Sequence, residues 1–158
     1  MFTMDRNPYS PPNAPVADIV GSGPQSAPLY SPRQMYLAAF LGTPIAAAWF
    51  MRRNFKTLGN ESRAENMLWL GVVATVAVFS IGTLLPSGIP NMVVPIAYSY
   101  AIYQYASFLF KAEYDKHINA GGRKGSTWTV VGVSLLIAII FIAVVIAVVF
   151  AVRTYPTG

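Results

Sequence analysis

One long apolar segment of this chain contains four polar side chains that could form a binding site: Tyr100, Tyr103, Gln104 and Ser107. Their spacings of three and four residues place them on one face of a helix. That face could line the path of a solute, or it could pair with other helices, each hydrogen bond contributing about 0.6 to 2 kcal/mol. A solute pathway usually needs more polar groups than one amide and a few hydroxyls, so we favour the packing role. We therefore predict that Tyr100, Gln104 and Ser107 point into a helical bundle.

The only histidine of the chain, His117, could act as a base or a metal ligand together with Glu113. It lies among charged residues, where a histidine is more often solvated, and we expect a solvated side chain here. Residues 121–127 are rich in glycine and basic residues, but they lack the spacing and the preceding strand of a phosphate-binding loop. We interpret them as a flexible basic turn.

The long apolar segments contain no Asp, Glu, Lys, Arg or His side chain. Such ionisable groups are costly in lipid, so where they occur they usually serve a function. This pattern argues against a proton-coupled exporter and against haem held between intramembrane histidines. The sequence has no cysteine, which argues against a thiol-disulfide oxidoreductase. It also lacks the Gly-x-Ser-x-Gly motif and partner histidine of a serine hydrolase. We predict that the protein is not an enzyme and carries no metal or cofactor.

The composition indicates a membrane protein. Of the 158 residues, 54% are hydrophobic and 11% are charged, whereas a soluble domain has about 25% charged residues. In lipid a helix is the only local structure that satisfies its own backbone. We expect an all-α, multi-pass transmembrane bundle over residues 32–155, with spans near residues 35–51, 67–85, 92–110 and 128–152.

The first of these segments is short for a span and contains a proline. Residues 35–51 are near the lower length limit for crossing a bilayer, and Pro44 should kink the helix. Two arrangements stay open. We favour four spans, and the alternative is three spans preceded by a re-entrant first helix.

Basic residues flank the segments unevenly, which predicts their orientation. Eight of the eleven Lys and Arg lie within residues 52–66 and 111–127, and the positive-inside rule makes both regions cytoplasmic. Four spans then place both termini in the periplasm, whereas a re-entrant first helix keeps the N-terminal tail in the cytoplasm. Anionic lipid headgroups are the expected ligands of the basic residues nearest the apolar segments: Arg52, Arg53, Lys56, Arg123 and Lys124. We expect no nucleic-acid partner, because no soluble domain is predicted to present a basic face.

The N-terminal region, residues 1–31, holds six of the twelve prolines and is predicted to be disordered. It contains a candidate docking peptide in polyproline form, made by Asn7, Pro8, Tyr9, Pro11 and Pro12. The alternative is a disordered leader without a partner. In either case we expect few contacts between residues 1–30 and the helices.

Small residues recur every four positions in three of the segments. These stripes are Ala38, Gly42 and Ala46, then Gly71 and Thr75, and finally Ala143, Ala147 and Ala151. Such stripes let helix backbones approach closely, and we expect them to pack within the chain.

The segment Asn7-Pro8-Tyr9-Ser10-Pro11-Pro12 resembles a short motif, Asn-Pro-Tyr-x-Pro-Pro, that precedes the first helix of many uncharacterised small bacterial membrane proteins. Residues 30–34, 41–44 and 53–55 also resemble the opening of one such family of unknown function. The resemblance implies a bacterial inner-membrane location and no mechanism.

Two functions are compatible with these features. The first is an accessory or interaction subunit, which includes a protector against a membrane-targeted toxin. The alternative is a small oligomeric transporter or channel for a neutral or lipid-like solute. Both need the lipid bilayer, and both need a membrane-protein partner or self-association.

Overall fold

The structure is a computed structural model of the whole chain, and it describes residues 27–86, 88–90 and 92–154. Within these ranges the chain forms five helices and no strand, and the helices are α1 (Pro32–Gly42), α2 (Pro44–Thr57), α3 (Glu61–Leu84), α4 (Val93–Asn119) and α5 (Thr127–Thr154). The all-α prediction is confirmed. The candidate docking residues Asn7, Pro8, Tyr9, Pro11 and Pro12 lie outside the described residues.

Two of the helices, α3 and α5, are long and apolar enough to cross a membrane. α4 has 27 residues, but its Tyr, Gln and Ser side chains lower its mean hydropathy, and it is not one of the two. A four-helix membrane bundle is therefore not confirmed.

The predicted first span, residues 35–51, is not a single helix. α1 ends at Gly42, Thr43 has a φ of 105°, and α2 begins at Pro44. Proline has no N–H for the carbonyl oxygen of Phe40, and it disfavours the helical conformation of the residue before it. The kink predicted at Pro44 is therefore a complete break, and the prediction of one continuous helix is wrong.

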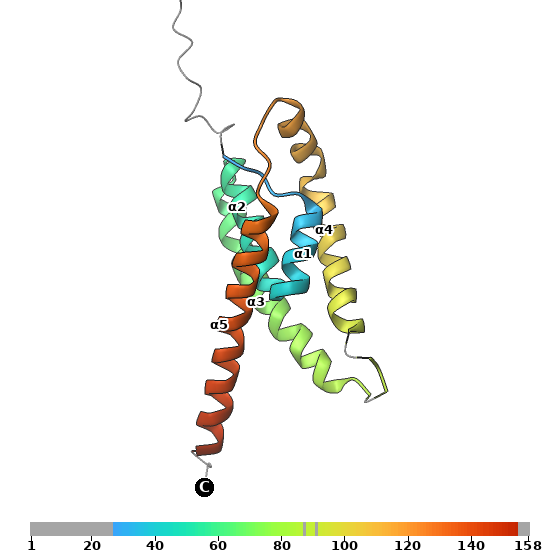
Figure 1. Cartoon of the computed structure of the whole chain (residues 1–158), viewed down its shortest axis with the longest axis vertical. Coiled ribbons are helices and arrows are strands. Elements are labelled where there is room, and N and C mark those ends of the chain that lie inside the picture. Colours follow the sequence, from blue (N-terminus) through green and yellow to red (C-terminus); the bar gives the residue numbers. More distant parts are fainter. Residues whose placement is uncertain (1–26, 87, 91, 155–158) are drawn as a thin grey trace, which may run out of the picture.

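α1 and α2 form an antiparallel hairpin (Figure 1). Asn54, near the end of α2, bonds to the residue that comes two positions before α1. Its Oδ1 accepts from the N–H of Tyr30 at 2.9 Å, and its Nδ2 donates to the carbonyl oxygen of Tyr30 at 2.8 Å. Both open ends of the hairpin therefore lie together, with Thr43 at the tip, which is the geometry that the re-entrant alternative requires.

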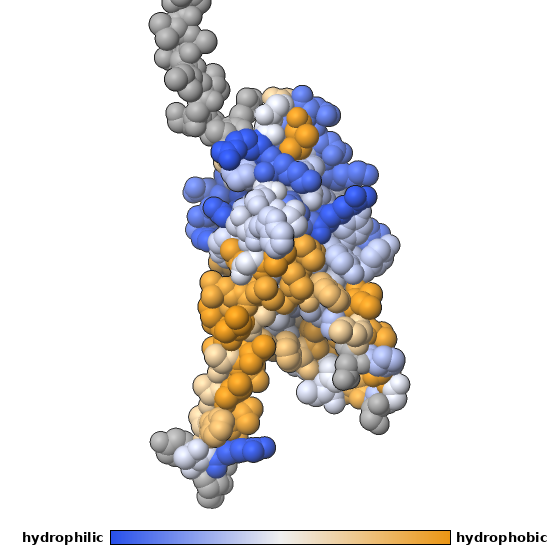
Figure 2. Space-filling view, viewed as in Figure 1, coloured by the Kyte–Doolittle hydropathy of each residue, from blue (hydrophilic) through white to orange (hydrophobic). Residues whose placement is uncertain are grey.

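The start of α1 lies beside the turn that joins α4 to α5. Gly125 N donates to the carbonyl oxygen of Leu29 at 2.8 Å, and Leu29 N donates to that of Arg123 at 3.1 Å. The side chain of Gln34 adds a third link, because its Nε2 donates to the carbonyl oxygen of Gly125 at 2.7 Å. We call this part of the molecule the basic end, and Figure 2 shows hydrophilic residues there and hydrophobic residues below it. Four spans would put the start of α1 and the end of α5 at the same end, but the structure puts them at opposite ends (Figure 1).

The core lies in the half of the molecule next to the basic end. Met35, Phe50 and Phe110 are among its buried side chains, which come mostly from the hairpin. Beyond the hairpin tip little is buried, and none of the most apolar stretch of α5 is. Leu29 is 1% exposed and Tyr30 is 3% exposed. The prediction of few contacts is therefore wrong for these two residues.

Candidate functional site

The hairpin tip, residues Gly42–Pro44, is packed tightly against α5. A Cβ atom at Gly42 would lie 2.7 Å from the carbonyl oxygen of Ser134 and 2.7 Å from the Cβ of Ala46. Ala38 and Ala46 continue the same stripe and are both fully buried. The internal packing predicted for Ala38, Gly42 and Ala46 is confirmed.

The second small-residue stripe packs α3 against α2. A Cβ atom at Gly71 would overlap the Cβ of Ala48, and Thr75 is 3% exposed. Thr75 also donates its hydroxyl proton to the carbonyl oxygen of Gly71 at 2.8 Å. Packing within the chain is thus confirmed for this stripe. It is wrong for the third stripe, because all three of its residues are exposed on α5: Ala143, Ala147 and Ala151.

The break between α1 and α2 leaves backbone groups without a partner in their own helix. Side chains of neighbouring helices form hydrogen bonds with these groups. In the first turn of α2, Ile45 N donates to Thr75 Oγ1 at 3.2 Å. In the last turn of α1, the carbonyl oxygen of Ala39 accepts from the Tyr98 hydroxyl at 3.2 Å and from Thr43 N at 3.0 Å. Such partners are the condition under which a broken helix is tolerated among apolar side chains.

Three hydroxyl oxygens are shielded from solvent and have no hydrogen-bond partner among the described residues: Thr43 Oγ1, Ser99 Oγ and Ser134 Oγ. Ser134 lies against Gly42 at the tip, and Ser99 follows Tyr98, which bonds to α1. Sequence reasoning missed all three residues. Serine at a helix contact is ordinary for its small size, so no sequence signal marks these positions.

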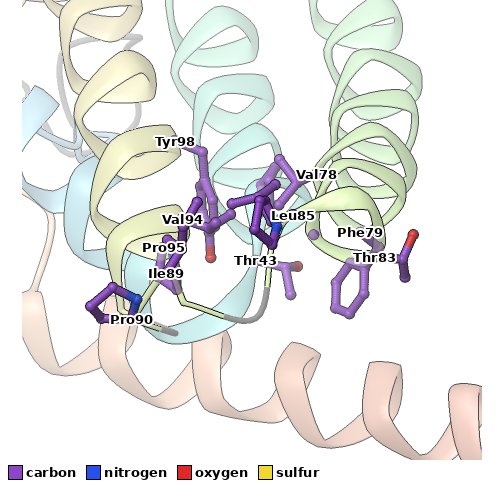
Figure 3. Close-up of a pocket in the computed structure, with 13 residues that line it drawn as sticks. Thr43, Val78, Phe79, Thr83, Leu85, Ile89, Pro90, Val94, Pro95 and Tyr98 are labelled. Carbon is purple, nitrogen blue, oxygen red and sulfur yellow. The ribbon is translucent and has the colours of Figure 1, made fainter.

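A pocket of about 410 Å³ lies beneath the hairpin tip (Figure 3). Thr43 and Pro44 cover it on the side of the tip, and its walls come from the second half of α3 and the first turns of α4. The far end is lined by Leu85, Pro86, Ile89 and Pro90. The walls carry apolar side chains such as Val78, Phe79 and Val94, and the hydroxyl-bearing Tyr98 also lines the space. Sequence reasoning did not predict this pocket, because it depends on the hairpin turning back.

Two of the four residues on the predicted polar face of α4 are turned away from the bundle. Tyr100 is 57% exposed, Gln104 is also exposed, and Tyr103 and Ser107 are half-buried. The prediction that Tyr100 and Gln104 point inward is wrong. The inward face instead carries smaller or apolar side chains: Ser99, Ala106 and Phe110. The helical spacing correctly groups residues on a face, but it does not say which face packs.

The five candidate headgroup-binding residues gather at the basic end, on the last turns of α2 and in the α4–α5 turn: Arg52, Arg53, Lys56, Arg123 and Lys124. Arg53 also holds the start of the hairpin. Its Nη1 donates to the Tyr30 hydroxyl at 3.4 Å, and its guanidinium lies 4.9 Å from the centre of the Trp49 ring. The group can therefore contact headgroups while it supports the fold.

His117 packs beneath the α4–α5 turn. Its Nε2 is shielded and has no hydrogen-bond partner among the described residues, and a Cβ atom at Gly122 would overlap the imidazole ring. The side chain as a whole is half-buried, so it is less solvated than predicted. Across the part of the chain that the structure describes, no three acidic or histidine side chains come together to hold a metal ion.

Comparisons with protein-family models, with curated proteins and with solved structures find no match for this chain. The resemblance to small bacterial membrane proteins stays a prediction, and the function has to be inferred from the geometry of this chain alone.

Proposed function

We propose that the protein is an integral membrane protein with three spanning helices and one re-entrant hairpin. α5 has 28 residues, which gives about 42 Å, more than the hydrocarbon core of about 30 Å. α1 has 11 residues, which gives about 16 Å, or about half of that core. These lengths support a hairpin that enters from the basic end and turns back near the middle of the bilayer.

The charge distribution supports a cytoplasmic position for the basic end. Residues 52–66 and 111–127 hold eight of the eleven Lys and Arg, and positive residues are retained on the cytoplasmic side. Residues 27–31 then lie in the cytoplasm and the end of α5 lies outside. The resemblance at residues 7–12 supports a bacterial inner membrane as the location.

We infer that the protein is an accessory subunit that binds another membrane protein through the outer face of α4. The observation that carries this proposal is the exposure of Tyr100 and Gln104 on that face. An amide without a hydrogen-bond partner costs about 2 to 7 kcal/mol in an apolar environment. A partner helix that presents a hydrogen-bonding side chain at the same depth removes this cost.

The residues around the polar pair suit a helix–helix contact. Ala97 and Ala101 are exposed on the same helix, four positions apart, and small residues at this spacing let a partner backbone approach closely. Tyr100 supplies a large rigid ring beside them. A protector that holds a membrane-targeted toxin would use the same face.

Photo-cross-linking in native membranes tests this proposal. The photoreactive residue p-benzoylphenylalanine replaces Tyr100, and in a matched control it replaces Phe150, which is 68% exposed on α5. We expect a discrete cross-linked protein from position 100 and none from position 150. Gln104→Leu should lower the yield about tenfold, because it removes an interhelical hydrogen bond of about 1 to 2 kcal/mol.

Two outcomes would contradict the proposal. The first is cross-linking at position 100 to lipid alone, or to the same products as position 150. The second is a product with twice the mass of the chain, which would make the α4 face a contact between two copies.

A further inference from the structure

The pocket beneath the hairpin tip exists because the hairpin ends partway along the molecule. α1 and α2 pack among the longer helices only on the side of Thr43 that faces the basic end (Figure 1). On the other side α3 and α4 make few contacts with each other, and Gly82 has no side chain to fill the space. The volume of about 410 Å³ falls within the range of about 300 to 1,000 Å³ that is usual for small-molecule sites.

The lining of the pocket suits an uncharged ligand. Val78, Phe79 and Val94 supply hydrocarbon surface. None of the described residues that line it is charged, and residues 85–92 contain no charged residue in the sequence. An ion or a charged headgroup would lose its hydration there without a replacement, whereas a hydrocarbon chain would not.

One hydroxyl group, that of Tyr98, lies at the end of the pocket nearest the hairpin tip. Tyr98 donates its proton to the carbonyl oxygen of Ala39, so the phenolic oxygen can still accept a hydrogen bond. Thr43 also lines this end, but its hydroxyl oxygen is shielded and cannot reach a ligand. A ligand hydroxyl can therefore donate to the oxygen of Tyr98.

We propose that this pocket binds a long-chain neutral alcohol from the bilayer. Its hydrocarbon chain lies along Val78, Phe79 and Val94, and its hydroxyl lies at Tyr98. The site rests on the membrane location proposed above, but it does not depend on a partner at the outer face of α4.

Two glycines provide a matched pair of variants. Gly82 lines the pocket, and Gly132 lies on α5 and is exposed. A Cβ atom at either position meets nothing within 4 Å, so an added side chain starts in open space at both. At Gly82 the ring takes up pocket space, and at Gly132 it projects away from the bundle.

The probe is hexadecanol that carries a diazirine and an alkyne on its chain, added to the full-length protein in phosphatidylcholine nanodiscs. We expect photolabelled residues on the pocket-lining parts of α3 and α4. Gly82→Phe should reduce this labelling about tenfold, and Gly132→Phe should leave it unchanged. Equal labelling of the two variants, with equal thermal unfolding midpoints, would overturn the proposal.

A second comparison tests the hydroxyl contact. Tyr98→Phe should reduce labelling by the alcohol several-fold, as expected for one lost hydrogen bond, and leave labelling by a hexadecane probe with the same photoreactive group unchanged. If palmitic acid carrying that group labels the pocket as strongly as the alcohol at neutral pH, the neutral-alcohol assignment is wrong. A protein that fails to enter nanodiscs refutes the membrane location itself, whereas a reconstituted protein without pocket labelling refutes only this site.

Discussion

Gly42 and Ser134 determine how closely α1 approaches α5. The carbonyl oxygen of Ser134 occupies the place where a side chain at Gly42 would begin, and a backbone atom cannot move aside as the end of a flexible side chain can. Ser134 is itself fully buried. The contact therefore tolerates neither a larger residue at Gly42 nor a shift of α5 toward α1.

We expect Gly42→Val to destabilise the protein by about 2 to 3 kcal/mol, because the added atoms overlap the carbonyl oxygen of Ser134. Thermal unfolding in mild detergent, followed by circular dichroism, measures the change. Gly132→Val is the control, since that position has open space around it. Equal unfolding midpoints for the two variants would show that the α1–α5 contact has room for a side chain at Gly42.

At the scale of elements, hydrogen bonds from side chains to the backbone hold the hairpin at both ends. Thr75 and Tyr98 bond to the backbone at the tip. At the open end, Asn54 bonds to both backbone groups of Tyr30 and is 0% exposed. The amide of Asn54 thereby supplies the two hydrogen bonds that a neighbouring strand or helix turn would otherwise give to the backbone of Tyr30.

Asn54→Leu keeps a similar side-chain volume but leaves the N–H and carbonyl oxygen of Tyr30 unpaired. Each buried group without a partner costs about 1 to 3 kcal/mol, so we expect a clear loss of stability and faster trypsin cleavage after Arg33. Asn119→Leu, at the exposed end of α4, should change neither quantity. The role given to Asn54 is untenable if the two variants unfold and are cleaved alike.

At the scale of the whole molecule, the hairpin changes the number of times the chain runs from one end to the other. The start of α1 and the α4–α5 turn are joined by backbone hydrogen bonds at the basic end, while α5 ends at the far end (Figure 1). Three long helices then connect the two ends. A bilayer around the apolar half in Figure 2 would leave the basic end in water.

Single-cysteine labelling checks this topology, because the chain has no cysteine of its own. In intact cells a membrane-impermeant maleimide should label Gly88→Cys and Thr154→Cys. Ala27→Cys and Leu58→Cys should react only after the cells are opened, since both lie at the basic end. Labelling of position 27 together with position 88 would restore the four-span arrangement.

The sequence by itself determined the all-α class, the rough positions of the apolar helices and the charge of the loops between them. These features are local along the chain, since run length, proline positions and charge counts need no knowledge of neighbours. The start of α1 is equally local. Ser31 and Gln34, three positions apart, form a capping box, in which each side chain accepts from the backbone N–H of the other residue.

Only the tertiary structure decided that the first segment turns back at Thr43 and that α4 presents Ser99 rather than Gln104 to the bundle. Pro44 is compatible with a kink or with a break. The break persists because Thr75 and Tyr98 bond to the backbone at the tip. Their partners, Ile45 and Ala39, lie 30 and 59 positions away in the sequence. The orientation of α4 follows from fit, since small and apolar residues pack against the hairpin more closely than the larger polar ones on the outer face. Contacts between residues so far apart in sequence leave no local pattern, so the pocket and the exposed polar face emerged only from the folded chain.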